Sequence, residues 1–198
     1  AHSWNSGKVT TAATPTSNAK MTYACSVCSQ TKTGELSKTS EVVVIPAGSR
    51  KTVSMTQDPI DYNGKGVFIK DRSVTLSSYA MGQYEVTQEL YNAVLSSDTT
   101  CNASPSSFSS SAESGESQNL RPVEQVTWYD AVYFCNALTK LVMTDADCVY
   151  TITGITRDST QKYISSATVT MDLTKKGYRL PTEAEWEFAA RGGDATAD

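Results

Sequence analysis

The segment around Thr182 places the tightest local constraint on the fold of this chain. Thr182 and Glu185 have the spacing of a capping box, in which the hydroxyl accepts a hydrogen bond from a helical amide and the carboxylate accepts one from the threonine amide. Pro181 prevents the helix from starting earlier. Arg191 suits the negative end of the helix dipole, and Gly192 can supply a left-handed stop. The sequence therefore predicts a short helix after Thr182. We expect its packing face to consist of Trp186, Ala189 and Ala190.

Two other threonines carry the same start signal. Thr87 is predicted to cap a helix at 88–95, and Thr127 a longer helix from Trp128 to about Val142. Asp130 falls in the first turn of the longer helix, where the dipole favours a negative charge. The apolar residues of this helix recur every three or four positions, which is typical of a helix that faces a core. They are Ala131, Phe134, Cys135, Leu138, Leu141 and Val142.

Short β-branched or alternating runs predict strands between these helices. They fall at 41–46, 53–55, 74–76, 79–85, 149–153 and 168–173. Residues 96–118 form a Ser-rich segment that we expect to be a mobile loop, too polar to pack. Strands and helices that do not alternate regularly indicate the α+β class.

Residues 1–40 differ from the rest and predict a small all-β module, because short Thr-rich stretches are broken by turn residues. Four lysines against one glutamate make this part basic, whereas the whole chain carries a net charge of −4. The larger part is therefore acidic, which excludes the basic stripe of a nucleic-acid surface. We predict two domains, at 1–40 and 41–198.

Five cysteines cannot all pair within one chain. Cys25 and Cys28 form a CxxC pair, and His2 is the only histidine that could join them. Zinc prefers four ligands, so this set leaves three alternatives: an incomplete zinc site, a local disulfide or two free thiols. Cys135 lies on the apolar stripe, where a buried structural thiol is expected. Cys101 and Cys148 flank loops, and the sequence leaves open whether they pair with each other. We assign no metal or cofactor.

The lack of any long apolar run excludes a membrane-spanning helix. Abundant Ser and Thr, with one His, are typical of an extracytoplasmic protein. With a single histidine near the start, no Ser–His or Cys–His catalytic pair can be assembled. Glu183, Glu185 and Glu187 are expected to be structural. Arg121 and Arg179 are expected to form ion pairs with Glu124 and Glu183.

Three segments together resemble the formylglycine-generating-enzyme (sulfatase-modifying-factor) family. They run from Val74 to Gln88, from Arg121 to Asn136 and from Gly177 to Gly193, and the last contains the sequence GYRLPTEAEWEFAARGG. The segment from Ile45 to Gly48 also resembles an early strand of that family. The resemblance covers about three quarters of the chain and is much more specific than a single short motif.

This resemblance implies a C-type-lectin-like fold that is incomplete at its C-terminus. The family's catalytic cysteines, copper and calcium sites belong to the later half, so no catalytic residue is assigned here. Any ligand-binding residues are expected beyond Asp198. Residues 1–40 resemble a short repeat of bacterial surface proteins, in which a further cysteine usually stands where this chain has Pro15.

The resemblance leaves two functions. One is a surface-displayed, non-enzymatic binding protein, like the retroelement-diversified variable proteins of the TvpA type, whose ligand is an extracellular protein or other macromolecule. We expect a monomer. The alternative is a formylglycine-generating-type oxidase that acts on a cysteine or a small thiol. Fold resemblance alone does not decide between them.

Overall fold

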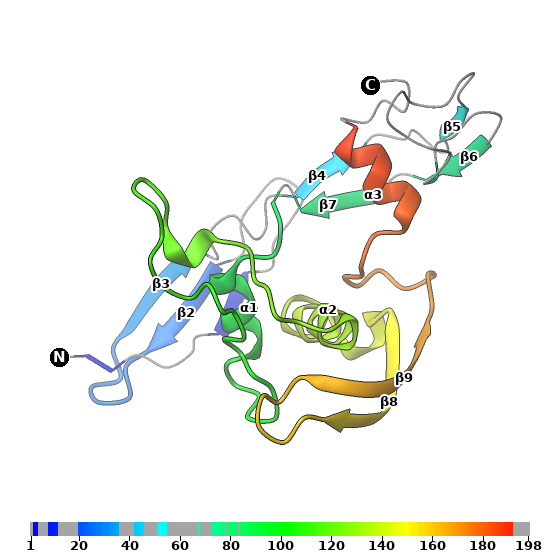
Figure 1. Ribbon diagram of the computed structural model, residues 1–198. Coiled ribbons are helices and arrows are strands. Elements are labelled where there is room, and N and C mark those ends of the chain that lie inside the picture. Colours follow the sequence, from blue (N-terminus) through cyan, green and yellow to red (C-terminus); the bar gives the residue numbers. More distant parts are fainter. Residues whose placement is uncertain are drawn as a thin grey trace. The chain divides into compact units, whose positions relative to one another are not determined.

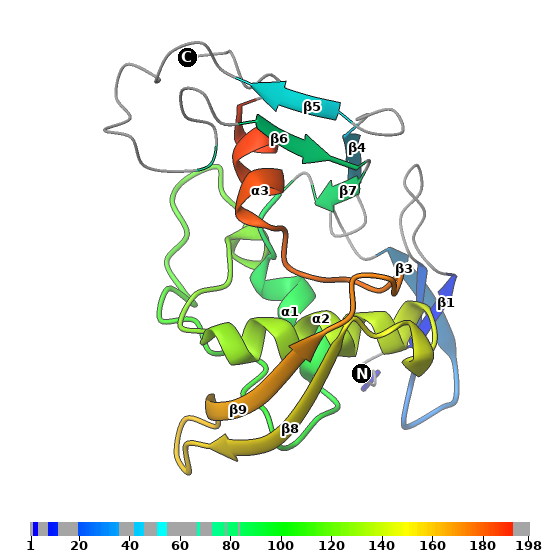
Figure 2. The same cartoon turned by 90° about the vertical axis from the view of Figure 1, so that its right-hand side faces the viewer.

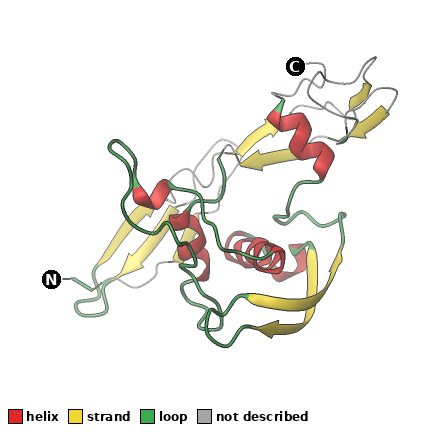
Figure 3. Ribbon diagram, viewed as in Figure 1, coloured by secondary structure: helices red, strands yellow, loops and turns green. Residues whose placement is uncertain are grey.

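The computed structural model describes residues 2–3, 8–11, 20–35, 42–45, 51–54, 67, 73–77, 79–82 and 84–191 (Figures 1 and 3). The chain divides into two compact units. The first unit comprises Ala1–Glu41 and Gly82–Leu180, and the second comprises Val42–Met81 and Pro181–Asp198. The predicted stop at Gly192 and the position of Pro15 lie outside the described residues.

The predicted helices of the first unit are confirmed, together with their caps. Helix α1 (Gln88–Leu95) begins at Thr87, whose hydroxyl accepts a hydrogen bond from the Leu90 amide. Helix α2 (Trp128–Val142) begins at Thr127, which forms a reciprocal capping box with Asp130. Two short 3-10 helices, η1 (Gln118–Leu120) and η2 (Asp145–Asp147), complete the helical part of this unit.

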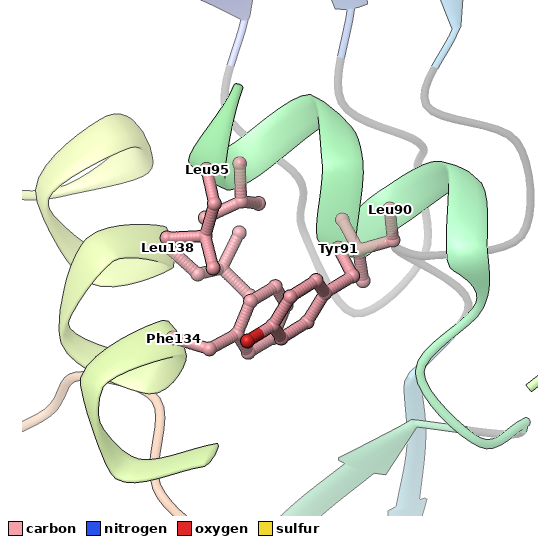
Figure 4. Close-up of a cluster of buried hydrophobic side chains, with 6 residues drawn as sticks. Leu90, Tyr91, Leu95, Phe134 and Leu138 are labelled. Atoms are coloured by element: carbon pink, nitrogen blue, oxygen red, sulfur yellow. The ribbon is translucent and has the colours of Figure 1, made fainter. Parts of the chain in front are cut away.

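The main core of the first unit lies between α1 and α2 (Figure 4). Leu90 and Leu95 of α1 are buried against Leu138 of α2. The rings of Tyr91 and Phe134 stack with their centroids 5.2 Å apart, an arrangement worth about 0.5–1.5 kcal/mol beyond area burial. The spacing of apolar residues along both helices thus produces one shared interior.

The opposite side of α2 packs on an antiparallel hairpin of β8 (Tyr150–Arg157) and β9 (Ile164–Met171). In Figures 1 and 2 the hairpin lies next to α2. Val132 is fully buried against this hairpin, although the predicted apolar stripe omits it. Leu141, which the stripe includes, is exposed instead. The prediction of a single apolar face was therefore wrong, because α2 is covered on two sides.

The predicted strands of residues 1–40 are confirmed as an antiparallel sheet. It consists of β1 (Lys8–Thr11), β2 (Lys20–Ala24) and β3 (Thr31–Glu35), in that order. Strand β1 contacts α2, and the side chain of Tyr23 packs against the α1–α2 core. This sheet therefore shares a compact unit with the two long helices.

In the second unit, two strand pairs accompany helix α3 (Glu183–Ala190) (Figure 2). The pairs are β4 (Val42–Ile45) with β7 (Tyr79–Gly82), and β5 (Lys51–Ser54) with β6 (Ser73–Leu76). The capping box of Thr182 and Glu185 is confirmed. The predicted packing face was wrong, because Trp186 is 60% exposed whereas Phe188 is 1% exposed and packs on Leu76.

The Ser-rich segment 96–118 is held to its neighbours rather than left without packing. The Phe108 carbonyl accepts hydrogen bonds from the side-chain amides of Gln88 and Gln118 at 3.1 and 2.7 Å. The Phe108 amide donates to the Glu124 carboxylate at 2.9 Å, and Ser106 is buried. The expectation that this loop does not pack was therefore wrong, because its polar groups find polar partners.

Within the described part of the chain, no helix has both the length and the apolar character needed to cross a bilayer.

Candidate functional site

The structure brings together His2, Cys25 and Cys28, whose ligand atoms all lie within 4.8 Å of one another. The Cys28 sulfur lies 3.2 Å from His2 Nδ1. Cys25 is 3% exposed, whereas Cys28 and His2 are exposed. The cluster therefore has one buried and two accessible ligand groups. Among the described residues this is the only group of three or more metal-ligating side chains that is this close.

The backbone between β2 and β3 forms the turn that positions the two thiols. The Cys25 amide donates to the Gln30 carbonyl at 2.8 Å, and the Ser29 amide donates to the Cys25 carbonyl at 3.1 Å. Ser29 has a φ of 58°, in the left-handed region that non-glycine residues rarely adopt. This residue reverses the chain immediately after Cys28, so that both sulfurs lie on the same side as His2.

The N-terminal residues are attached to the same turn by backbone contacts. The Ser26 amide donates to the Ser3 carbonyl at 2.9 Å, and the Ser26 hydroxyl donates to the same oxygen at 3.2 Å. Because Ser3 follows His2 directly, these bonds hold the backbone of His2 beside the turn. The sequence suggested His2 as a third ligand, but only the folded turn shows that it reaches the cysteines.

Hydrogen bonds to sulfur stabilise the thiolate form of Cys25. The Val27 amide donates to Cys25 Sγ at 3.4 Å, and this contact is the largest of several causes that together lower the pKa of Cys25 to about 6. Burial opposes the effect, whereas smaller contributions from His2 and Cys28 add to it. Such a pKa makes this sulfur predominantly a thiolate at neutral pH, which is the form that binds metals.

The other three cysteines have thiol pKa values above the ordinary value, in contrast to Cys25. Burial raises the pKa of Cys135 to about 12, and Cys135 is buried as predicted. Burial and the hydrogen bond to Asp98 raise the pKa of Cys101 to about 11, and burial raises the pKa of Cys148. All three are free thiols, and Cys148 lies near the Asn136 carbonyl. The possible Cys101–Cys148 disulfide is therefore absent from the structure.

The carboxylates of α3 have structural partners. Glu185 completes the capping box, and Glu187 forms an ion pair with Arg191 at 3.1 Å while also accepting the Val67 amide at 2.9 Å. The expected pair of Arg121 and Glu124 was wrong. Arg121 lies 3.7 Å from Glu116, because the Glu124 carboxylate accepts the Phe108 amide.

A groove of about 470 Å³ runs beside α1 in the first unit. Side chains from β2, α1, the Ser-rich segment, η1 and the loop after η1 line it, and polar and apolar groups contribute about equally. Among them are Tyr23, Asn92, Ser104, Gln118 and Val123. The sequence did not indicate this groove, because its lining residues come from segments far apart in the chain.

The capped helices and the segment that leads into α3 define a mixed α and β scaffold of the sulfatase-modifying-factor type. A family model described as the sulfatase-modifying factor enzyme 1-like domain matches residues 28–198, and the chain belongs to this family. The resemblance inferred from the sequence is thus confirmed at the level of the family.

The chain is also 36% identical over 171 residues to the chaperone protein LppX of Paenibacillus barcinonensis, an alignment that covers 85% of this chain. The chain spans about half the length of this curated relative, since the alignment covers 50% of it. No solved structure matches the chain.

Proposed function

We propose that this chain is part of an extracytoplasmic, surface-displayed binding protein whose ligand is another polypeptide, and that it is not an enzyme. The observation that carries this proposal is the similarity to a protein named as a chaperone, which extends over 85% of the chain. A chaperone acts by binding other proteins. The same scaffold in both proteins favours a binding role for this chain.

Two of the thiols, those of Cys101 and Cys135, are poorly suited to redox chemistry, in contrast to that of Cys25. Oxidation of a substrate cysteine by the family's chemistry requires reactive thiolates, whereas burial holds the pKa values of Cys101 and Cys135 at about 11 and 12. These two residues lie on and beside the helical core, where a protonated thiol packs as a small apolar group. Their environments therefore suit a structural role rather than redox chemistry.

Two finer assignments belong to this proposal. The scaffold is of the C-type-lectin-like kind, and its binding surface is a diversified C-terminal segment that follows Asp198, as in the retroelement-diversified variable proteins. The groove beside α1, with both polar and apolar lining, provides a second candidate surface in the present segment. Its amide and hydroxyl groups match the backbone donors and acceptors of an extended polypeptide.

The test uses the full-length protein and two assays in parallel. In the first assay, reduced and unfolded lysozyme is diluted into buffer, and light scattering follows its aggregation with or without the protein. We expect suppression near equimolar ratio, whereas serum albumin at the same concentration has little effect. In the second assay, an oxygen electrode follows a cysteine-containing peptide with copper, and we expect uptake equal to the copper blank.

Catalytic oxygen uptake above the copper blank that persists in the Cys25→Ser/Cys28→Ser variant would contradict the proposal and support the oxidase alternative. Failure to suppress aggregation, or to bind any unfolded polypeptide in a pull-down with purified components, would also count against it. The variant Gln118→Ala removes a side chain that lines the groove. It therefore distinguishes binding in the groove from binding at the proposed C-terminal segment. Unchanged suppression would place the binding surface outside the groove.

A further inference from the structure

The cluster of His2, Cys25 and Cys28 has a composition and a geometry that the proposed binding function does not use. Two sulfurs and one imidazole nitrogen are the ligand types of structural zinc sites, whereas calcium and magnesium require oxygen. We propose that these three residues bind one Zn²⁺ ion, which fastens the N-terminal residues to the turn between β2 and β3.

The distances within the cluster suit this ion. With Zn–S near 2.3 Å and Zn–N near 2.0–2.1 Å, tetrahedral ligand atoms lie roughly 3.5–3.8 Å apart. In the structure all three ligand atoms lie within 4.8 Å, and His2 Nδ1 is 3.2 Å from the Cys28 sulfur. The atoms are therefore within about 1 Å of tetrahedral spacing, and the exposed side chains of His2 and Cys28 can rotate to make this adjustment.

The turn is organised around the sulfur of Cys25 rather than around a disulfide. The Val27 amide points at this sulfur from 3.4 Å, and a thiolate accepts such a bond far better than a disulfide sulfur does. The backbone bonds of Cys25 and Ser29 close the turn without a covalent link. The buried Cys25 would bind the ion from the protein side, and the exposed Cys28 and His2 would bind it from the solvent side.

Three protein ligands leave the fourth zinc position to water or to a donor from outside the described residues. Two thiolates balance the charge of the ion, so the site needs no further anion to be neutral. Metal binding would stabilise the attachment of Ser3 to Ser26, because the ion holds residue 2 beside the turn. The ion is therefore expected to be structural.

The experiment uses the reduced, metal-free chain and Co²⁺ as a spectroscopic substitute for Zn²⁺. We expect one equivalent of Co²⁺ to produce a thiolate-to-cobalt charge-transfer band and the intense visible bands of a tetrahedral site, and one equivalent of Zn²⁺ to abolish both. Cys25→Ser and Cys28→Ser should remove the charge-transfer band or strongly reduce it, and His2→Ala should weaken zinc binding at least about 10-fold. Cys148→Ser is the matched control and should leave the spectrum unchanged.

Hydrogen exchange provides a second measurement that does not depend on the variants. Zinc should slow exchange of the Ser26 amide, and a chelator should restore the rate. The proposal is overturned if the reduced wild-type chain gives no thiolate–cobalt band, or if the band survives in the Cys25→Ser/Cys28→Ser double variant. It is also overturned if the purified chain carries a Cys25–Cys28 disulfide and binds no zinc after reduction.

Discussion

Replacement of Gly177 by alanine should destabilise the first unit strongly, because the space for a side chain is already filled. A Cβ atom at this position would lie 2.4 Å from the Asp147 carbonyl oxygen. It would also lie 2.7 and 2.8 Å from the Cγ2 and Oγ1 atoms of Thr139, a side chain with 0% exposure inside α2. Neither neighbour is a flexible side-chain end that can move aside.

The size of the loss in unfolding free energy follows from the hydrogen bonds that would be stretched if the backbone moved to make room for the Cβ atom. The chain at Gly177 would have to move by about 1 Å to reach ordinary contact distances. Such a shift stretches the bond from the Gly177 amide to the Asp147 carbonyl and the bond from the Tyr178 amide to Thr139 Oγ1, each 2.9 Å long. Overpacking costs about 1–3 kcal/mol and each of the two weakened bonds about 0.5–1.5 kcal/mol, so we expect a loss of about 2–6 kcal/mol.

Urea unfolding of the chain, followed by tryptophan fluorescence, measures this loss. In a separate thermal unfolding experiment the melting temperature should fall by roughly 4–24 °C, at about 2–4 °C per kcal/mol for a chain of this size. Gly154→Ala is the control, because Gly154 has a φ of +62° and no atom within 4 Å of the added Cβ, so that only backbone strain of about 1–2 kcal/mol applies. A Gly177→Ala protein as stable as wild type would refute the steric reasoning.

Three further predictions concern single contacts. Asp130→Ala should cost about 1–3 kcal/mol in urea unfolding, because the buried Ile164 amide loses the carboxylate that accepts it at 2.9 Å, whereas Asp130→Asn should retain part of this bond. Burial raises the pKa of Asp98, but hydrogen bonds from neighbours that include Tyr133 outweigh it and leave this pKa below its usual value. Asp98 therefore contributes stability above about pH 4 that is lost as the pH falls through its folded pKa, so Tyr133→Phe should show a deficit at pH 7 that narrows below pH 4. Ser29→Gly should raise the unfolding free energy by about 0–1.5 kcal/mol, because relief of about 1–2 kcal/mol of strain at a φ of 58° exceeds the entropic cost of glycine, about 0.5–1 kcal/mol, and a lower value would contradict the assigned backbone conformation.

The helix starts were predictable because each depends on atoms only a few residues apart. Thr127 and Asp130 exchange hydrogen bonds across three residues, and Thr182 and Glu185 do the same. A short window of sequence therefore contains everything that the cap requires. The family resemblance was predictable for a related reason, since it depends on contiguous motifs such as the segment that leads into α3.

The packing of α3 could not be predicted from its own sequence. Eight residues make little more than two turns, too few for periodicity to distinguish Trp186 from Phe188 as the buried aromatic. Leu76 decides the matter, because strand β6 brings it against Phe188. For α2 the difficulty was different, since a helix covered on two sides has two apolar faces and Val132 belongs to the second.

The candidate metal site was only partly predictable. The CxxC spacing identified two sulfurs on a tight turn, but the distance between His2 and Cys28 depends on the pairing of β2 with β3 and on the bond between Ser26 and Ser3. The capping boxes and the cluster of His2, Cys25 and Cys28 therefore differ in how far they can be predicted from the sequence. A contact that closes within one turn can be derived from residue order, whereas a contact across 26 residues requires the fold.

The proposed zinc site also changes how the binding function must be tested. Copper prefers the same soft ligands, so copper added to an oxygen-uptake assay would bind at Cys25 and Cys28 and oxidise their thiols without any family catalysis. The assay is therefore decisive only in the Cys25→Ser/Cys28→Ser variant. Uptake that disappears in this variant originates in the N-terminal turn and leaves the binding proposal intact. Uptake that persists must come from elsewhere in the full-length protein and would establish an oxidase, whatever the outcome of the zinc experiment.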